Sequence, residues 1–148
     1  MAEAPTLFTI GFTQKSAEQF FSKLINAGVR RVLDIRLRNN SQLSGFAKGR
    51  DLNYFLKQIG DIEYHHVELL APTGELLNGY KKNKGSWEDF EKGFNSLLEE
   101  RLSMLELAPS FLDGACLLCS EHEADHCHRR LVAQRLKVVH PGLRIIHL

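Results

Sequence analysis

The start of the chain alternates a short apolar run, a helix pattern and a second short apolar run. Leu7–Phe12 is typical of a short buried strand, and Ser16 and Gln19 have the spacing of a capping box that begins a helix. Gly28 is expected to end this helix, and Val29–Ile35 is the second predicted strand. A strand–helix–strand unit of this kind implies parallel strands joined by a right-handed crossover.

The same alternation continues to the C-terminus. Asp51 is expected to cap a short helix that Gly60 ends, whereas Glu68–Gly85 is predicted to be an irregular loop. Ser86 and Asp89 indicate another helix start. The other predicted strands are Ile62–Val67, Ala115–Cys119 and Leu143–Leu148, and the last predicted helix is Cys127–Val138. The pattern predicts an α/β fold, a mostly parallel open sheet of about five strands with helices on both faces.

Length and composition indicate an ordinary globular protein. The 148 residues match one domain of usual size, so we expect a single domain over residues 1–148. The net charge of +1 excludes a broad polybasic surface but permits a local basic patch. No apolar stretch approaches the roughly 18 residues of a membrane helix, and the first residues lack a signal-peptide pattern, so no membrane contact is expected.

Three cysteines lie close together near the C-terminus: Cys116, Cys119 and Cys127. A disulfide framework would be spread along the chain and would use an even number of cysteines. We therefore expect free thiols in a reducing compartment, which indicates a cytoplasmic protein. Cys116 and Cys119 lie three apart in a predicted strand and so face opposite sides of the sheet.

The segment from Cys119 to Arg130 carries the most reactive side chains. Cys119 ends a predicted strand, and the helix after the loop opens with His128 and Arg129. Cations at a helix N-terminus oppose the helix dipole, so an anion bound there would explain their presence. The same field would lower the pKa of a neighbouring thiol. The alternative is that the arginines pair with acidic side chains of the same loop.

The segment also offers metal ligands, which are Cys119, His122, His126, Cys127 and His128. These nitrogen and sulfur atoms suit zinc or iron, but their spacing lacks the two separated short pairs of structural zinc sites. The prediction is therefore a site without a cofactor, and a metal held by Cys119, Cys127 and His128 is the alternative. A third interpretation is a pair, Cys119 and Cys127, that oxidises reversibly.

A second group of candidates follows the second predicted strand. Asp34 and Arg36 lie two apart, so they share a face at the sheet edge where ligands bind. Asp34 can act as a base, and Arg36 can clamp a carboxylate or phosphate. The alternative is a salt bridge from Asp34 to a helix arginine that holds two strands together.

The polar loop that follows adds three candidate ligand-binding residues, Gln42, Phe46 and Lys48. Gln42 offers hydrogen bonds and Lys48 a positive charge. Phe46 can stack on a base, although packing of this side chain on the core is the slightly favoured alternative.

Several short motifs resemble the domain of unknown function 488 family. They are Thr9–Gly11, Leu33–Arg36, Leu118–Glu121, Cys127–Arg129 and Ile146–Leu148, and they span nearly the whole chain. Two further stretches, Ser41–Phe46 and Leu70–Thr73, resemble one branch of that family. The resemblance implies a compact α/β domain with functional residues Asp34, Arg36, Cys119, Glu121, Cys127, His128 and Arg129. It implies no reaction, and Phe12 stands where many relatives have histidine.

Together these residues predict a domain that binds a phosphate-bearing ligand, either a nucleotide or a nucleic acid. The anion would lie between Arg36 and the helix start at His128, while Asp34 or Glu121 would supply acid–base chemistry. Cys119 would be a nucleophile or a buried thiol that shapes the site. The alternative is a non-catalytic module that binds metal, nucleic acid or protein, so the sequence leaves enzyme activity and oligomeric state open.

Overall fold

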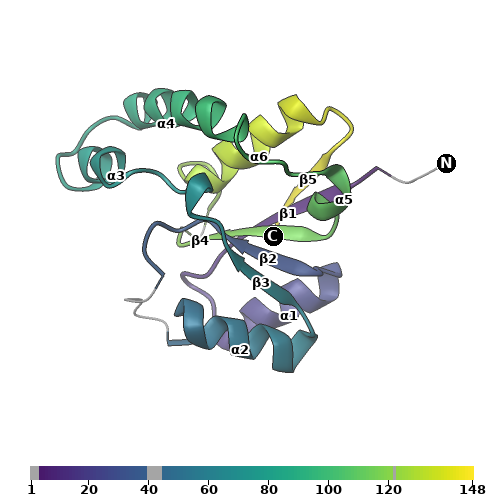
Figure 1. The fold of residues 1–148 in the computed structure, drawn as a ribbon. Helices are drawn as coiled ribbons and strands as arrows, with labels where there is room; N and C mark the ends of the chain where they lie inside the picture. The colour runs from purple at the N-terminus through teal and green to yellow at the C-terminus, as the bar shows by residue number, and fades with distance from the viewer. Residues whose placement is uncertain (1–3, 40–44, 122) are drawn as a thin grey trace.

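The computed structural model describes residues 4–39, 45–121 and 123–148 (Figure 1). In these residues five parallel strands form one sheet in the order β3-β2-β4-β1-β5. The strands are β1 (Thr6–Gly11), β2 (Arg31–Asp34), β3 (Glu63–His66), β4 (Ala115–Cys119) and β5 (Arg144–His147). The longer helices are α1 (Ala17–Ala27), α2 (Gly49–Gly60), α3 (Gly74–Lys81), α4 (Trp87–Leu102) and α6 (His128–Val139). Shorter turns are η1 (Gly45–Ala47), η2 (Glu68–Leu70) and α5 (Pro109–Leu112).

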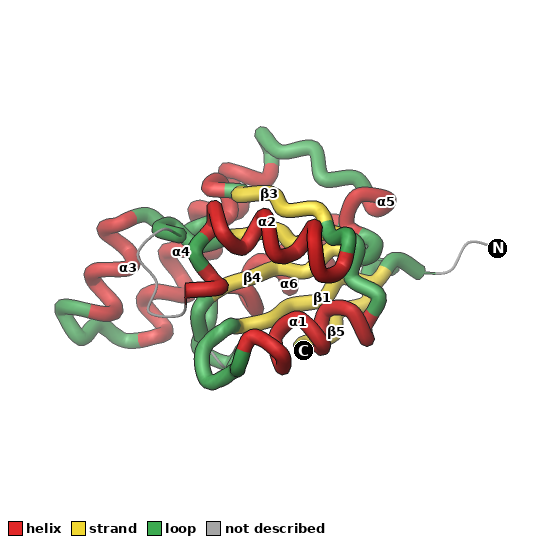
Figure 2. Tube along the Cα trace, turned by 90° about the horizontal axis from the view of Figure 1, so that it is seen from below, coloured by secondary structure: helices red, strands yellow, loops and turns green. Residues whose placement is uncertain are grey.

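Two hydrophobic layers separate this sheet from its helices. Helices α1 and α2 cover one face, and α4 and α6 cover the other (Figures 1 and 2). Side chains alternate along β4, so Cys116 and Leu118 pack in the α1–α2 layer, while Leu117 and Cys119 pack in the α4–α6 layer. The predicted fold class is therefore confirmed, and Cys116 and Cys119 lie on opposite sides of the sheet as predicted.

Local side-chain hydrogen bonds explain where two of the helices begin. The Ser16 hydroxyl accepts from the Gln19 N–H at 3.1 Å, and the Gln19 side chain accepts from the Ser16 N–H at 2.9 Å. This is the predicted capping box of α1, and Ser86 caps α4 through the Asp89 N–H at 3.1 Å. Gly28 ends α1 with φ of +78°, a left-handed conformation that glycine adopts without steric cost.

Two local predictions are wrong. Helix α2 begins at Gly49, before Asp51, and Lys48 occupies its N-cap position without a side-chain hydrogen bond. The segment Glu68–Gly85 is not an irregular loop, because it contains η2 and α3, and the Thr73 hydroxyl caps α3 at 3.2 Å. Glycines are typical helix breakers, but Gly74 and Gly79 are tolerated within α3, which packs against α4.

The order of the strands creates the crevice that holds the candidate site. Strand β4 lies between β2 and β1; the chain leaves β1 and β2 toward α1 and α2, but it leaves β4 toward α6. Neighbouring connections that diverge to opposite faces open a crevice at the carboxyl ends of the strands. Gly11 and Asp34 end β1 and β2 at this edge, and Cys119 ends β4 between them. None of the helices in the described part of the chain has the length and apolar character of a membrane-spanning segment.

Candidate functional site

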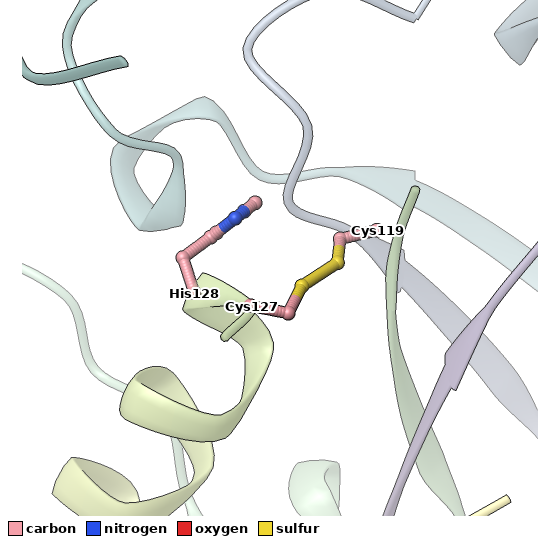
Figure 3. Close-up of side chains that lie close together, drawn as sticks. All are labelled: Cys119, Cys127 and His128. Atoms are coloured by element: carbon pink, nitrogen blue, oxygen red, sulfur yellow. A yellow bond between two sulfur atoms is a disulfide. The ribbon is translucent and has the colours of Figure 1, made fainter. Parts of the chain in front are cut away.

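Two cysteines and a histidine converge at the carboxyl edge of the sheet (Figure 3). Cys119 is the last residue of β4, Cys127 is the N-cap of α6, and His128 is the first residue of α6. Their two sulfur atoms and one imidazole nitrogen lie within 4.8 Å of one another. All three residues border a pocket of about 200 Å³. The fold therefore brings the three alternative metal ligands together at the wall of one pocket.

The structure joins Sγ of Cys119 to Sγ of Cys127 as a disulfide (Figure 3). The expectation of free thiols is therefore wrong for this pair, and Cys116 is the free cysteine. The α-carbons of the pair lie 7.6 Å apart, whereas disulfides usually span about 4.4–6.8 Å. That wider separation is accommodated when two thiolates bind one metal ion, because the ion lies between the sulfur atoms.

A backbone hydrogen bond orients the His128 ring. Its Nε2 lies 2.6 Å from the carbonyl oxygen of Ile35, which can only accept, so Nε2 carries the proton and Nδ1 the lone pair. Burial lowers the pKa of His128 to about 4, so the ring is neutral at neutral pH. Histidines that bind metals commonly donate their other ring N–H to a backbone carbonyl in this way.

A buried chain of polar groups runs from Cys119 to the last strand. Arg129, which is 1% exposed, donates from Nη1 to the Cys119 sulfur at 3.4 Å and to the Glu121 carbonyl at 2.6 Å. Its Nε donates to Thr9 Oγ1 at 3.4 Å, and that oxygen lies 2.6 Å from Nδ1 of His147. Burial, together with Arg129, lowers the pKa of His147. In the reduced protein, this guanidinium beside the sulfur would favour the thiolate form of Cys119.

Gly11 makes this arrangement sterically possible. A β-carbon at this position would overlap the Glu121 carbonyl and would lie 3.0 Å from Nη1 of Arg129. The glycine in the first sequence motif therefore lets the loop after β4 approach β1 closely enough for Arg129 to bind its carbonyl.

Asp34 and Arg36 form a separate buried ion pair. Nε and Nη2 of Arg36 each donate to the Asp34 carboxylate at 2.8 Å. The side chain of Arg36 is 3% exposed and that of Asp34 is 0% exposed. The Tyr64 hydroxyl donates to the same carboxylate at 2.6 Å, and burial raises the pKa of Tyr64, which keeps this donor protonated. Arg36 also donates to the Ala47 carbonyl at 2.7 Å. These bonds tie the end of β2 to β3 and to η1.

The ion partner of Asp34 differs from the helix arginine that the alternative interpretation predicted. Asp34 pairs with Arg36 and not with a helix arginine, and it does not border the pocket at Cys119. Nε and Nη2 of Arg36 bind Asp34 and the Ala47 carbonyl, whereas its buried Nη1 has no hydrogen-bond partner among the described residues. Arg129 binds its own acceptors around Cys119. Arg36 and His128 border the same pocket, so an anion bound between Arg36 and the start of α6 stays a prediction.

The three loop candidates lie away from the pocket or outside the described residues. Phe46 packs on the core, with ring centroids 5.3 Å from Phe20 and 5.9 Å from Phe21. Lys48 is exposed at the start of α2. Gln42, and also His122 of the proposed metal ligands, lie outside the residues that the structure describes.

Aromatic side chains from α4 and from the loop before α6 form a column, and three of them, His126, Trp87 and Phe90, border the pocket. His126, Trp87, Phe90 and Phe94 stack in sequence, with centroids 5.1, 5.2 and 5.8 Å apart and interplanar angles of 23°, 25° and 26°. Tyr80 packs edge-on against Trp87 at 5.5 Å. Tyr80 was not predicted as a site residue because its helix, α3, lies in a segment that was predicted to be a loop. The tryptophan that follows this segment, Trp87, is a signal in the sequence for an aromatic cluster there.

Glu121 is the acidic residue of the pocket. Its Oε1 accepts a hydrogen bond from Nζ of Lys81 at 2.7 Å, and both side chains are about half exposed. Of the two carboxylates considered from the sequence, Glu121 borders the pocket beside Cys119, and Asp34 does not.

Comparison with known protein families shows the family to which the chain belongs. The family model described as domain of unknown function DUF488 matches residues 16–136, which include both the Asp34–Arg36 pair and the Cys119–Arg130 segment. The chain belongs to this family. Membership of the DUF488 family confirms the resemblance for Leu33–Arg36, Leu118–Glu121 and Cys127–Arg129, whereas Thr9–Gly11 and Ile146–Leu148 lie outside the matched residues. It carries no reaction with it. Comparisons with curated proteins and with solved structures found no match.

Cys116 is expected to be unreactive in the native protein. It is fully buried on the far side of the sheet, and burial raises the pKa of its thiol. We expect it to react with a thiol reagent at least about a hundredfold more slowly than free cysteine until the protein unfolds. Labelling kinetics with peptide mapping measures this rate, and rapid native labelling of Cys116 would contradict its placement.

Proposed function

We propose that this DUF488 domain is a metal-dependent enzyme whose ion is held by Cys119, Cys127 and His128. The observation that carries the proposal is the convergence of three ligand atoms within 4.8 Å at the wall of a pocket. Catalytic zinc sites use three protein ligands and leave a fourth position for water or substrate. Two sulfurs and one nitrogen suit zinc, and iron is the second candidate.

The groups around the three ligands support the same function. The Ile35 carbonyl orients the His128 ring and keeps Nδ1 available, as the residues around metal-bound histidines commonly do. Arg129 donates to the sulfur of Cys119 and so favours the thiolate that a metal requires.

The residues of the pocket support a hydrolytic reaction. Zinc in a site with an open position lowers the pKa of a bound water to about 7. Glu121 borders the same pocket and can accept and return a proton, and Lys81 holds its carboxylate in place at 2.7 Å. A phosphate on the ligand would meet Arg36, whose buried Nη1 has no hydrogen-bond partner among the described residues, and the exposed side chains of Arg38 and Lys81, which border the same pocket.

Metal analysis of protein purified under reducing conditions and without chelator tests this function. We expect about one equivalent of zinc or iron per chain. Acidification should release the ion, because protons compete for both thiolates and for the imidazole. Less than about 0.1 equivalent after incubation of the reduced protein with zinc would overturn the proposal.

The contact between the two sulfurs favours a second candidate function, a reversible thiol–disulfide pair. Cys119 and Cys127 would give up two hydrogens to a peroxide, forming one disulfide and two molecules of water. The intact mass would fall by about 2 Da, and a dithiol would restore it. Reduced protein that binds no metal but shows this reversible change would favour the redox function over the metal centre.

A further inference from the structure

The pocket beside the Cys/His cluster has a size and a lining that restrict its ligand. Its volume is about 200 Å³, below the roughly 300–1,000 Å³ of pockets that enclose drug-sized molecules. A single ring with its substituents fits such a volume, whereas a peptide or an oligonucleotide does not. Any larger part of the ligand must therefore lie outside, toward the exposed side chains of Arg38 and Lys81 at the rim.

The wall of the pocket favours a flat ligand. His126, Trp87 and Phe90 border the pocket and have nearly parallel ring planes, with interplanar angles of 23° and 25°. Tyr80 closes the same side, with its ring 5.5 Å from Trp87. Because Trp87 is stacked between His126 and Phe90, a planar ring beside this column would lie against ring edges, and edge-to-face contact is a favoured geometry of aromatic pairs.

The polar groups of the pocket distinguish a heteroaromatic ring from a hydrocarbon. Arg36, Arg38, Lys81, Ser120 and Glu121 border the pocket together with its apolar and aromatic side chains. A few polar groups in an apolar pocket fix the orientation of a ligand that has matching donors and acceptors. A ring without nitrogen or oxygen would desolvate these groups and return no hydrogen bonds.

We infer that the pocket binds one planar heteroaromatic ring of nucleobase size, free or as the base of a nucleoside or nucleotide. The inference rests on the proposed function only for the chemistry that follows binding. The ring lies beside the aromatic column, with one edge toward Cys119, Cys127 and His128 and the other toward Lys81. Contact between a base and the ring edges of the column tolerates different bases, because every base has a π-face.

The single tryptophan of the chain, Trp87, provides a direct test. Its ring borders the pocket and is 8% exposed, so its fluorescence reports a ring that enters. Zinc-loaded and metal-free wild-type protein are each titrated with adenosine and cytidine, with ribose and inorganic phosphate as blanks. We expect a saturable change at one site with at least one nucleoside and none with either blank.

A pair of tyrosine variants checks where the ring binds, with calorimetry as the readout because Tyr80 touches Trp87. Tyr80→Leu removes an aromatic wall and should weaken nucleoside binding about tenfold. Tyr54→Leu is the matched control, since Tyr54 is 63% exposed on α2, on the opposite face of the sheet. Equal binding by the two variants, or no saturable change in wild-type protein at millimolar nucleoside, would overturn the inference.

The outcomes separate this inference from the proposed function. Zinc-loaded protein that binds no ring overturns the inference alone and leaves the metal centre standing. Protein that binds a nucleoside but never retains metal supports the inference and removes the proposed function.

Discussion

Replacing Cys127 by serine is expected to lower bound zinc from about one equivalent to less than about 0.1. The hydroxyl of serine is a poor zinc ligand, and the two groups that remain, Cys119 and His128, cannot complete a site with one open position. The reduced variant and the wild type are incubated with zinc, desalted and analysed for metal. Thermal unfolding with and without zinc gives an independent measure, because an ion that binds only the native state raises its stability.

Cys116→Ser is the matched control for this prediction. It also removes one cysteine, but this residue lies in β4 on the side of the sheet that faces α1 and α2. This variant should keep its zinc and its zinc-dependent rise in melting temperature. A Cys127→Ser protein that binds as much zinc as Cys116→Ser would place the metal elsewhere.

His128→Asn separates metal binding from disulfide formation. This variant retains Cys119 and Cys127, so a redox pair would still form, whereas a metal centre would lose its nitrogen ligand. Loss of zinc with intact oxidation in this variant would support the metal centre as a function distinct from the redox chemistry.

Asp34→Asn is expected to lower the free energy of unfolding by about 3–5 kcal/mol. The change removes the negative charge that balances the Arg36 guanidinium. This guanidinium is 3% exposed and donates two hydrogen bonds of 2.8 Å to the Asp34 carboxylate. A buried charge left without its partner is strongly destabilising, and domains of this kind are stable by only about 5–15 kcal/mol. Urea unfolding followed by circular dichroism measures the loss.

Glu63→Gln is the control for the buried pair. Glu63 forms a similar ion pair with Arg31 at 3.2 Å on the neighbouring strands, but its side chain is 61% exposed. Removal of an exposed partner is expected to cost less than about 1 kcal/mol. Near wild-type stability of Asp34→Asn would show that this carboxylate does not hold the fold and would return it to the candidates for catalysis.

Local interactions explain why much of the fold was predictable from the sequence. The capping box of Ser16 and Gln19, and the cap at Ser86, involve residues three apart, so their spacing is visible in the sequence before folding. Strand β4 was predicted with its observed bounds because a continuous apolar run marks a strand buried on both faces. Helix α3 was missed because its stability comes from packing against α4, and the glycines of its segment conceal its local pattern.

The amino-acid sequence by itself determined which side chains were available to the site, and only the tertiary structure decided how they are grouped. Asp34 and Cys119 both lie at the ends of neighbouring strands, yet Asp34 is paired within the fold while Cys119 meets Cys127 and His128. That division depends on the strand order β2-β4-β1 and on the faces to which the connections turn. Asp34 and Arg36 are two residues apart, and Cys119 and Cys127 are eight apart, so each pair is visible in the sequence. Which side chains border one pocket is decided only when the sheet has assembled, because β4 then lies between β2 and β1.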